Sequence, residues 1–191
     1  MRVLDLGCGS HKRKGAVGVD IARRSAADVI ANLDRPVYPF ADNTFDCIVC
    51  NHVIEHLSDV IKIFEEILRI AKPDTSIEGA TPHFSSAASY ADPTHRHHFG
   101  VRTFEFLAAS SHKPPGRMRR LMACLYHVGK LENIPAVGRR FERVEVRLKF
   151  NPLFQKVGIE WAANLYPEFY EAFFAFIIPA RDIVFRLKVI K

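Results

Sequence analysis

The stretch Val3-Leu4-Asp5-Leu6-Gly7-Cys8-Gly9 decides the fold of this chain. Its apolar residues around a single acid are typical of a short buried strand, which runs directly into a Gly-x-Gly turn. Glycine adopts backbone angles that other residues avoid, and it lets a ligand approach the main chain closely. A second short strand, residues 17–19, ends in Asp20. A nucleotide-like ligand presents its ribose hydroxyls to an acid in this position, so the two strands predict such a site.

Hydrophobic patterning extends this start to a series of strands and helices. Short apolar runs and period-two alternation predict strands at residues 2–6, 16–20, 29–31, 45–50, 76–81, 143–150 and 183–189. After the fourth strand, Ser58 is expected to cap a helix that Pro73 ends. Further helices are expected at residues 101–109, 118–127, 155–165 and 167–178.

The first two connections between strands are unusually short. Eight residues separate Gly9 from Gly18, and eight separate Asp20 from Val29. A parallel crossover usually needs a dozen or more residues, including a helix. Turns or irregular chain are therefore expected in place of the first two helices.

Length and composition indicate an ordinary globular protein of 191 residues in a single domain. The 27 basic and 21 acidic side chains give a net charge of +6, which suits either an anionic partner or a merely basic surface. We expect a cytoplasmic location, because neither a signal region nor a transmembrane segment is evident. Cys47 and Cys50 form a C-x-x-C inside a predicted strand, where the two side chains point to opposite faces, so they are expected to be buried apolar residues.

Four motifs, in order, resemble those of class I S-adenosylmethionine-dependent methyltransferases, most closely the type 11 group. They are residues 3–9, Gly18-Val19-Asp20, residues 39–46 and Val53-Ile54-Glu55-His56-Leu57. The resemblance implies a Rossmann-like α/β fold, with a seven-stranded, mostly parallel sheet and an antiparallel last strand. It also implies S-adenosylmethionine as cofactor. The single domain, 1–191, would comprise a cofactor-binding half, 1–83, and a remainder, 84–191, with an acceptor loop, late helices and a C-terminal hairpin.

The same resemblance assigns cofactor contacts to particular residues. Asp5 would help to hold the amino-acid end of the cofactor, and Asp20 both ribose hydroxyls, because a carboxylate accepts two hydrogen bonds side by side. The structural alternatives are a turn-capping role for Asp5 and a plain tight turn for the glycines. The expected cofactor-binding residues are Asp5, Gly7, Cys8, Gly9, Asp20, Ile21, Asn32, Leu33 and Asn51.

A histidine-rich segment follows the fifth predicted strand, and four His lie within its 16 residues, 83–98. Methyl transfer is an in-line displacement in which the protein aligns the acceptor and usually removes its proton, a task that suits a neutral His. His83 or His95 is therefore expected to be the catalytic base, without a required metal. The side chains expected to shape the acceptor pocket are Tyr90, Asp92 and Arg96.

Several metal interpretations of the histidines stay open beside this one. His52-Val53-Ile54-Glu55-His56 spells an inverted zinc-protease signature, although it follows a strand directly. Small-RNA 2′-O-methyltransferases carry a similar Glu-x-x-Glu-His run that binds a divalent ion, but His52 replaces the first Glu here. The histidines of residues 83–98 could also hold zinc or another metal, or could simply cap their loop.

The expected function is methyl transfer from S-adenosylmethionine to a hydroxyl of a small metabolite or saccharide by base-assisted displacement. One alternative is an RNA 2′-O-methyltransferase with a His/Glu metal site, which the basic groups favour but the lack of a recognisable nucleic-acid module does not. Another is a non-catalytic cofactor-binding protein. A C-terminal aromatic stripe is expected to pack in the core, with a homodimer face or a cover for an apolar or membrane-associated acceptor as alternatives; it comprises Trp161, Leu165, Phe169, Phe173 and Phe176.

Overall fold

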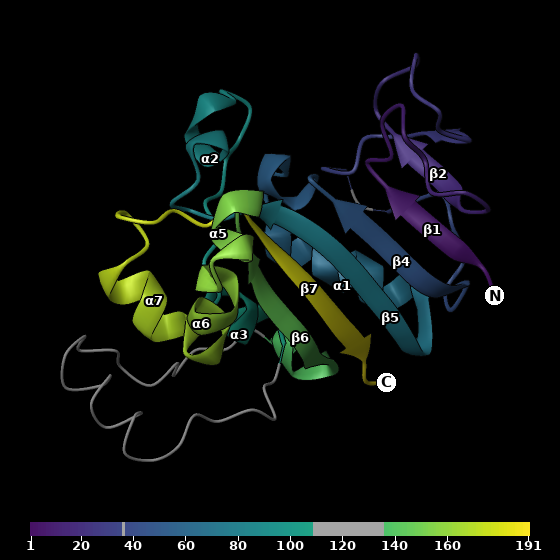
Figure 1. Ribbon diagram of the computed structural model, residues 1–191. Helices are drawn as coiled ribbons and strands as arrows, with labels where there is room; N and C mark the ends of the chain where they lie inside the picture. Colours follow the sequence, from purple (N-terminus) through teal and green to yellow (C-terminus); the bar gives the residue numbers. More distant parts are fainter. Residues whose placement is uncertain (36, 109–135) are drawn as a thin grey trace.

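One seven-stranded sheet forms the centre of the molecule. The computed structural model describes residues 1–35, 37–108 and 136–191 (Figure 1). The strand order is β3-β2-β1-β4-β5-β7-β6, and only β7 runs antiparallel to its neighbours. The strands are β1 (Val3–Leu6), β2 (Val17–Asp20), β3 (Val29–Ile30), β4 (Phe45–Asn51), β5 (Ala71–Pro82), β6 (Phe141–Lys149) and β7 (Asp182–Val189). The order confirms the predicted Rossmann-like sheet with its antiparallel last strand.

Helix α1 (Val60–Ile70) connects β4 to β5 and differs from its prediction at both ends. Its N-cap is Asp59, which accepts a hydrogen bond from the backbone N–H of Lys62 at 3.1 Å. The predicted cap at Ser58 is therefore wrong by one residue; the N–H of Ser58 instead donates to Asp34. Pro73 does not end the helix either, because the chain already turns into β5 at Ala71.

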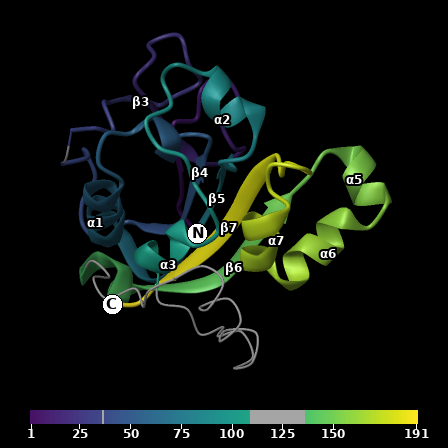
Figure 2. The same cartoon turned by 90° about the vertical axis from the view of Figure 1, so that its left-hand side faces the viewer.

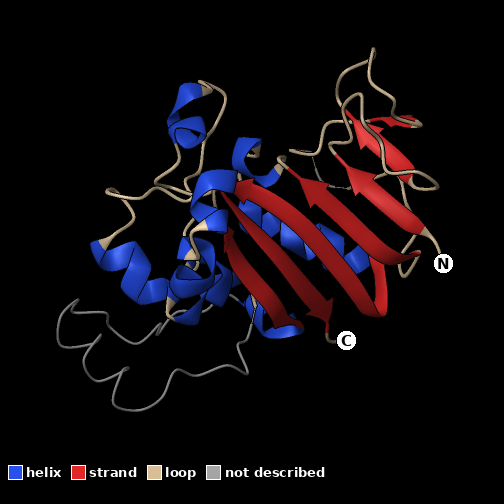
Figure 3. Cartoon of the chain, in the orientation of Figure 1, coloured by secondary structure: helices blue, strands red, loops and turns tan. Residues whose placement is uncertain are grey.

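The two early connections contain turns and no helix, as predicted, within residues 7–16 and 21–28. As a result, the described helices α1 and α3 (Thr103–Leu107) lie on one face of the sheet, behind it in Figure 3. The other face carries charged side chains in ion pairs. Glu78 lies 3.3 Å from Arg13 and 3.5 Å from Arg186. Polar pairs of this kind let one face of a mostly parallel sheet meet water.

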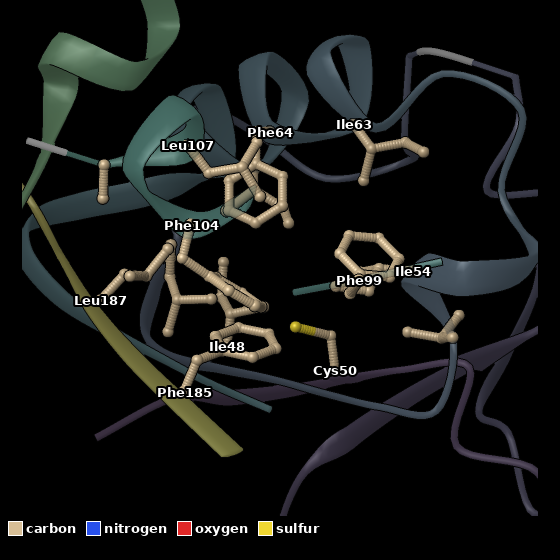
Figure 4. Packing of buried hydrophobic residues seen from close by; sticks show 14 of the residues in the cluster. Ile48, Cys50, Ile54, Ile63, Phe64, Phe99, Phe104, Leu107, Phe185 and Leu187 are labelled. Atoms are coloured by element: carbon tan, nitrogen blue, oxygen red, sulfur yellow. The ribbon is translucent and has the colours of Figure 1, made fainter. Parts of the chain in front are cut away.

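The hydrophobic core fills the space between the sheet and these two helices (Figure 4). Phe104 of α3 packs on Phe185 of β7 with ring centroids 4.6 Å apart. Phe64 of α1 meets Phe141 of β6 edge to face at 5.5 Å. Ile48 of β4 is fully buried between them. These contacts fix the positions of the strand ends at which the candidate site lies.

The C-x-x-C residues behave as predicted. Cys47 and Cys50 are both buried and free, and they point to opposite faces of β4. Cys50 lies in the core beside Ile48, and burial raises the pKa of its thiol. The two cysteines are thus packing residues.

The C-terminal helices are shorter than predicted, and they lie at the opposite end of the sheet from β1–β3 (Figure 2). The segment predicted as one helix, 155–165, falls into α5 (Pro152–Lys156) and α6 (Ile159–Leu165), because Gly158 has a left-handed φ of 80°. Helix α7 (Pro167–Phe173) begins at its proline, as predicted. The predicted helix at residues 118–127 lies outside the described residues. Within the described ranges, the remaining elements are α2 (Ala87–Ala91) and two 3-10 helices, η1 (Ile54–His56) and η2 (Ala136–Arg140).

The aromatic stripe does not pack in the core as a whole. Trp161 is 70% exposed and Phe176 80% exposed, so the core prediction is wrong for these side chains. Among the described residues, no helix has both the length and the apolar character needed to cross a bilayer.

Gly79, in the middle of β5, shows how tightly the sheet packs on its core face. A Cβ added there would lie 2.4 Å from the Cys50 carbonyl oxygen and 2.4 Å from the Phe185 ring. Gly79→Ala should therefore lower the free energy of unfolding by about 1–3 kcal/mol, as overpacking does. Urea denaturation would measure it. Ser76→Ala serves as the control and should be nearly neutral. Ser76 lies on the open face of the sheet, the face that carries the charged side chains.

Candidate functional site

The glycine turn lies at the carboxyl ends of β1 and β2, where ligands of open α/β sheets bind. Gly7 and Gly9 both have left-handed φ values, 62° and 52°. At Gly7 a Cβ would lie 2.5 Å from Cγ2 of Val53, so this glycine permits close packing. At Gly9 a Cβ would meet nothing within 4 Å. The backbone of the turn is thus open to a ligand at Gly9.

Asp20 joins the tip of β2 to this turn. One of its carboxylate oxygens accepts a hydrogen bond from the N–H of Gly9 at 2.8 Å, and the other from the N–H of Ala22 at 2.8 Å. Each oxygen keeps a second lone pair, so both can still accept from a diol. Ile21, directly after Asp20, is 65% exposed. The glycine turn and the acid at the tip of β2 therefore lie side by side, as predicted.

Asp5 accepts a hydrogen bond within the fold and also lines a cavity. It is buried, accepts a hydrogen bond from the N–H of Arg13 at 2.7 Å, and its pKa is raised by burial. This bond is the turn-capping interaction that the sequence left as an alternative. Asp5 also lines, together with Asn51, a cavity of about 430 Å³ on the open face of the sheet. The two expected residues from β1 and β4 thus lie at one depression.

The other expected cofactor residues lie around the same strand ends. Asn32, just after β3, accepts a hydrogen bond from the N–H of Asp34 at 2.9 Å. This bond uses only the side-chain oxygen of Asn32, so it does not occupy the amide N–H₂ group. Leu33 is buried, and its carbonyl accepts from the hydroxyl of Tyr38 at 3.0 Å. Cys8 is buried between the two glycines. Asn32 and Leu33 thus follow the end of β3, and Cys8 is part of the glycine turn itself.

A second cavity, of about 620 Å³, lies beyond the carboxyl ends of β4 and β5. Its lining includes His95 and Asp92 of the predicted acceptor loop. Tyr90 stacks on His98 with ring centroids 4.2 Å apart, and Arg96 donates to the hydroxyl of Ser58, so these two side chains point elsewhere. Of the loop residues expected at the acceptor pocket, His95 and Asp92 line this cavity, and Tyr90 and Arg96 do not.

His83 occupies a different environment from His95. Its side chain is fully buried, Nδ1 accepts from the N–H of Ser85 at 3.2 Å, and Nε2 lies 3.1 Å from the Glu171 carboxylate. Since Nδ1 accepts, the proton of the neutral ring is on Nε2 and is donated to Glu171. Glu171 lies 88 positions away, on α7, and sequence reasoning missed it. Both ring nitrogens of His83 are therefore engaged within the fold.

His83→Ala should accordingly destabilise the protein by about 2–4 kcal/mol, because it leaves the largely buried Glu171 with one donor fewer and opens a cavity. The melting temperature should fall by roughly 10 °C, which differential scanning calorimetry would measure. His98→Ala is the control, because its ring lies at the loop surface, and it should melt within a few degrees of the wild type. A His83→Ala variant as stable as the wild type would show that this buried pair contributes nothing.

Glu55, His56 and His95 come together at the second cavity, a grouping that the sequence did not predict. Glu55 is on η1, directly after β4, and its side chain is 1% exposed. Its backbone carbonyl accepts from the N–H groups of Arg96 at 2.8 Å and His97 at 3.2 Å. His52, with an unusual φ of 50°, lies 3.4 Å from the Glu55 carboxylate, and this nearby carboxylate raises the pKa of His52.

The strand order, the glycine turn and the acid at the tip of β2 define a Rossmann-like α/β protein that binds a nucleotide-type cofactor. The chain belongs to the methyltransferase domain family, whose model matches residues 1–111. It is a class I S-adenosylmethionine-dependent methyltransferase, and S-adenosylmethionine is its cofactor.

Solved structures share the fold at low sequence identity. A SAM-dependent methyltransferase from Archaeoglobus fulgidus is 17% identical, with a TM-score of 0.55 over 98% of this chain and 85% of the other. An S-adenosylmethionine-dependent methyltransferase from Mesorhizobium loti is 15% identical, with a TM-score of 0.54 over 98% and 90%. The [4+2]-cyclase SpnF is 14% identical, with a TM-score of 0.56 over 99% and 74%. No curated protein sequence matches significantly.

Proposed function

We propose that this methyltransferase transfers the methyl group to a hydroxyl of a small metabolite or saccharide. The observation that carries the proposal is the position of His95 in the second cavity. Nδ1 of its ring lies 3.1 Å from the Ser89 carbonyl oxygen, which can only accept, so the proton is on Nδ1. The lone pair of Nε2 is then free to take a proton from an acceptor hydroxyl.

The cofactor supplies an activated methyl group when it is bound. The residues proposed to hold it are those at the glycine turn and the neighbouring strand ends. The open backbone at Gly9 and the two remaining lone pairs of Asp20 fit a ligand with a ribose and a tail. Asn51, exposed at the end of β4, is proposed as a further contact. These residues bind and orient; the second cavity, beyond β4, receives the acceptor.

His95 is the proposed base, and His83 the second candidate that the sequence gives. Both ring nitrogens of His83 are engaged with Ser85 and Glu171, which favours His95 for proton removal. His83 then acts as a positioning residue, because its chain segment joins β5 to the loop that carries His95. Asp92, 4.0 Å from Nε2 of His95, lines the same cavity.

The size of the second cavity favours a small acceptor, since sites for small molecules typically enclose about 300–1,000 Å³. A specific observation also supports an RNA 2′-O-methyltransferase as the second candidate. Glu55 and His56, the part of the Glu-x-x-Glu-His likeness that this chain retains, lie next to His95.

A cytoplasmic location and a homodimer stay predictions, which cell fractionation and analytical ultracentrifugation would test.

Labelling with methyl-tritiated cofactor tests the proposal and separates the two candidates. The protein is incubated with the small-molecule fraction and, separately, the RNA fraction of a cell extract. Label in small hydroxylated compounds supports the first candidate, and alkali-stable label in ribose supports the second. Release of S-adenosylhomocysteine without label in either fraction, or no turnover at all, would contradict transfer to a hydroxyl.

A further inference from the structure

We propose that Glu55, His56 and His95 form a binding site for a divalent transition-metal ion. One ligand atom from each residue can be chosen so that all lie within 4.8 Å of one another. Two imidazole nitrogens and one carboxylate oxygen are a donor set that proteins use for Zn²⁺ and for other first-row divalent ions. The set leaves coordination positions open toward the cavity of about 620 Å³ that the three residues line.

Glu55 gives the first independent reason. Its side chain is only 1% exposed, and Oε2 accepts a hydrogen bond from the Thr81 hydroxyl at 3.1 Å. Oε1 is buried and has no hydrogen-bond partner among the described residues; Nδ1 of His52, at 3.4 Å, does not have hydrogen-bond geometry. A buried carboxylate oxygen without a partner is costly. A cation at this point would satisfy it.

The hydrogen bonds of the two histidines give the second reason. Nδ1 of His95 donates to the Ser89 carbonyl. Nδ1 of His56 lies 2.8 Å from the Thr94 hydroxyl, whose own proton is donated to Asp92 at 2.7 Å. The Thr94 oxygen therefore accepts from His56. In both rings Nε2 carries the lone pair, and metal-binding histidines are typically fixed by such a bond from the other nitrogen.

The backbone holds the three ligands together. Glu55 and His56 lie on η1 at the carboxyl end of β4, and the N–H groups of Arg96 and His97 bind the Glu55 carbonyl. This anchors the loop so that the His56 and His95 rings lie 4.6 Å apart, with an angle of 62° between their planes. The two imidazoles are thus held side by side at the cavity, next to the Glu55 carboxylate.

A catalytic role for the ion rests on the proposed function. As a Lewis acid, the ion lowers the pKa of a hydroxyl that binds to it. The hydroxyl proton passes to solvent, the new oxygen–carbon bond forms while the carbon–sulfur bond of the sulfonium breaks, and a neutral thioether leaves. With the ion bound, His95 is a ligand, and proton removal no longer needs its lone pair. In this proposal the reaction uses a metal ion, whereas the sequence led us to expect that none is required.

Isothermal titration of the chelator-treated full chain with Zn²⁺ tests the site. The wild type should bind one ion per chain. Glu55→Gln, His56→Ala and His95→Ala should each weaken binding by about 100-fold or more, since even residues that only orient metal ligands cost 10- to 100-fold. The matched control is His98→Ala: this histidine belongs to the same loop but lies outside the cluster, so its affinity should stay within about twofold. Circular dichroism verifies that every variant is folded.

Three results would overturn the site: no saturable Zn²⁺ binding by the folded wild type, equal affinity in folded His56→Ala, or an equal loss in His98→Ala. Methyl transfer is measured separately, with and without added Zn²⁺. Stimulation by the ion supports its catalytic role, and full activity after chelation overturns that role. If Zn²⁺ binds as predicted but no methyl group is transferred, the metal site stands and the proposed function fails.

Discussion

Replacing Asp20 by alanine should weaken binding of S-adenosylmethionine by about 100-fold or more. The carboxylate is expected to accept a hydrogen bond from each of the two ribose hydroxyls, and each hydrogen bond to a charged group contributes about 1.5–3 kcal/mol. Loss of two such bonds therefore costs at least about 3 kcal/mol, or about two orders of magnitude in affinity. Asp20 also accepts a hydrogen bond from the N–H of Gly9, so its loss loosens the turn that is proposed to contact the cofactor. Calorimetric titration of the variant measures the effect.

Asp28→Ala is the matched control for this experiment. Asp28 also accepts a backbone N–H, that of Gly18, and its carboxylate pairs with Lys12 instead of lying at the tip of β2. Its removal should change cofactor affinity by no more than a few-fold. If Asp20→Ala is folded and binds as tightly as Asp28→Ala, Asp20 does not hold the ribose.

Replacing His95 by alanine should lower kcat by about 100- to 10,000-fold, the range that a positioned acid or base contributes. Cofactor affinity should stay unchanged, because His95 lies in the second cavity and not at the glycine turn. The measurement is the rate of S-adenosylhomocysteine release at saturating cofactor, with the acceptor that labelling identifies. A general base and a metal ligand both predict this loss, and the Zn²⁺ titration distinguishes them.

His98→Ala and His83→Ala complete the comparison. His98→Ala should retain wild-type turnover. His83→Ala should lose thermal stability, and the turnover that it keeps at low temperature reports whether its ring takes part in the chemistry. If the His95 and His83 variants both keep full turnover, neither histidine is the base.

The geometry of the glycine turn and the first strands could be predicted because its signals are local. Glycines at φ values of 62° and 52° are read directly from Gly-x-Gly, and Asp20 is fixed by the strand that it ends. The missing helices follow from counting eight residues in each early connection. The antiparallel β7 was predictable from alternation at residues 183–189 together with the family resemblance.

The arrangement around the second cavity could not be predicted, because its contacts join distant parts of the chain. His83 pairs with Glu171 on a helix 88 positions later, and no local pattern marks that pair. His95 meets Glu55 and His56 only because backbone hydrogen bonds anchor its loop to η1. The exposure of Trp161 depends on where α6 lies against the sheet, and helical spacing alone cannot distinguish a core stripe from an exposed one.

The central claim is that the ends of β1 and β2 bind an adenosyl cofactor. Isothermal titration of the full chain with S-adenosylhomocysteine tests it most directly, because the demethylated product binds without turnover. We expect saturable binding at one molecule per chain, weakened by about 100-fold in Asp20→Ala. The absence of any binding heat at several temperatures, from a protein that circular dichroism shows to be folded, would contradict the claim.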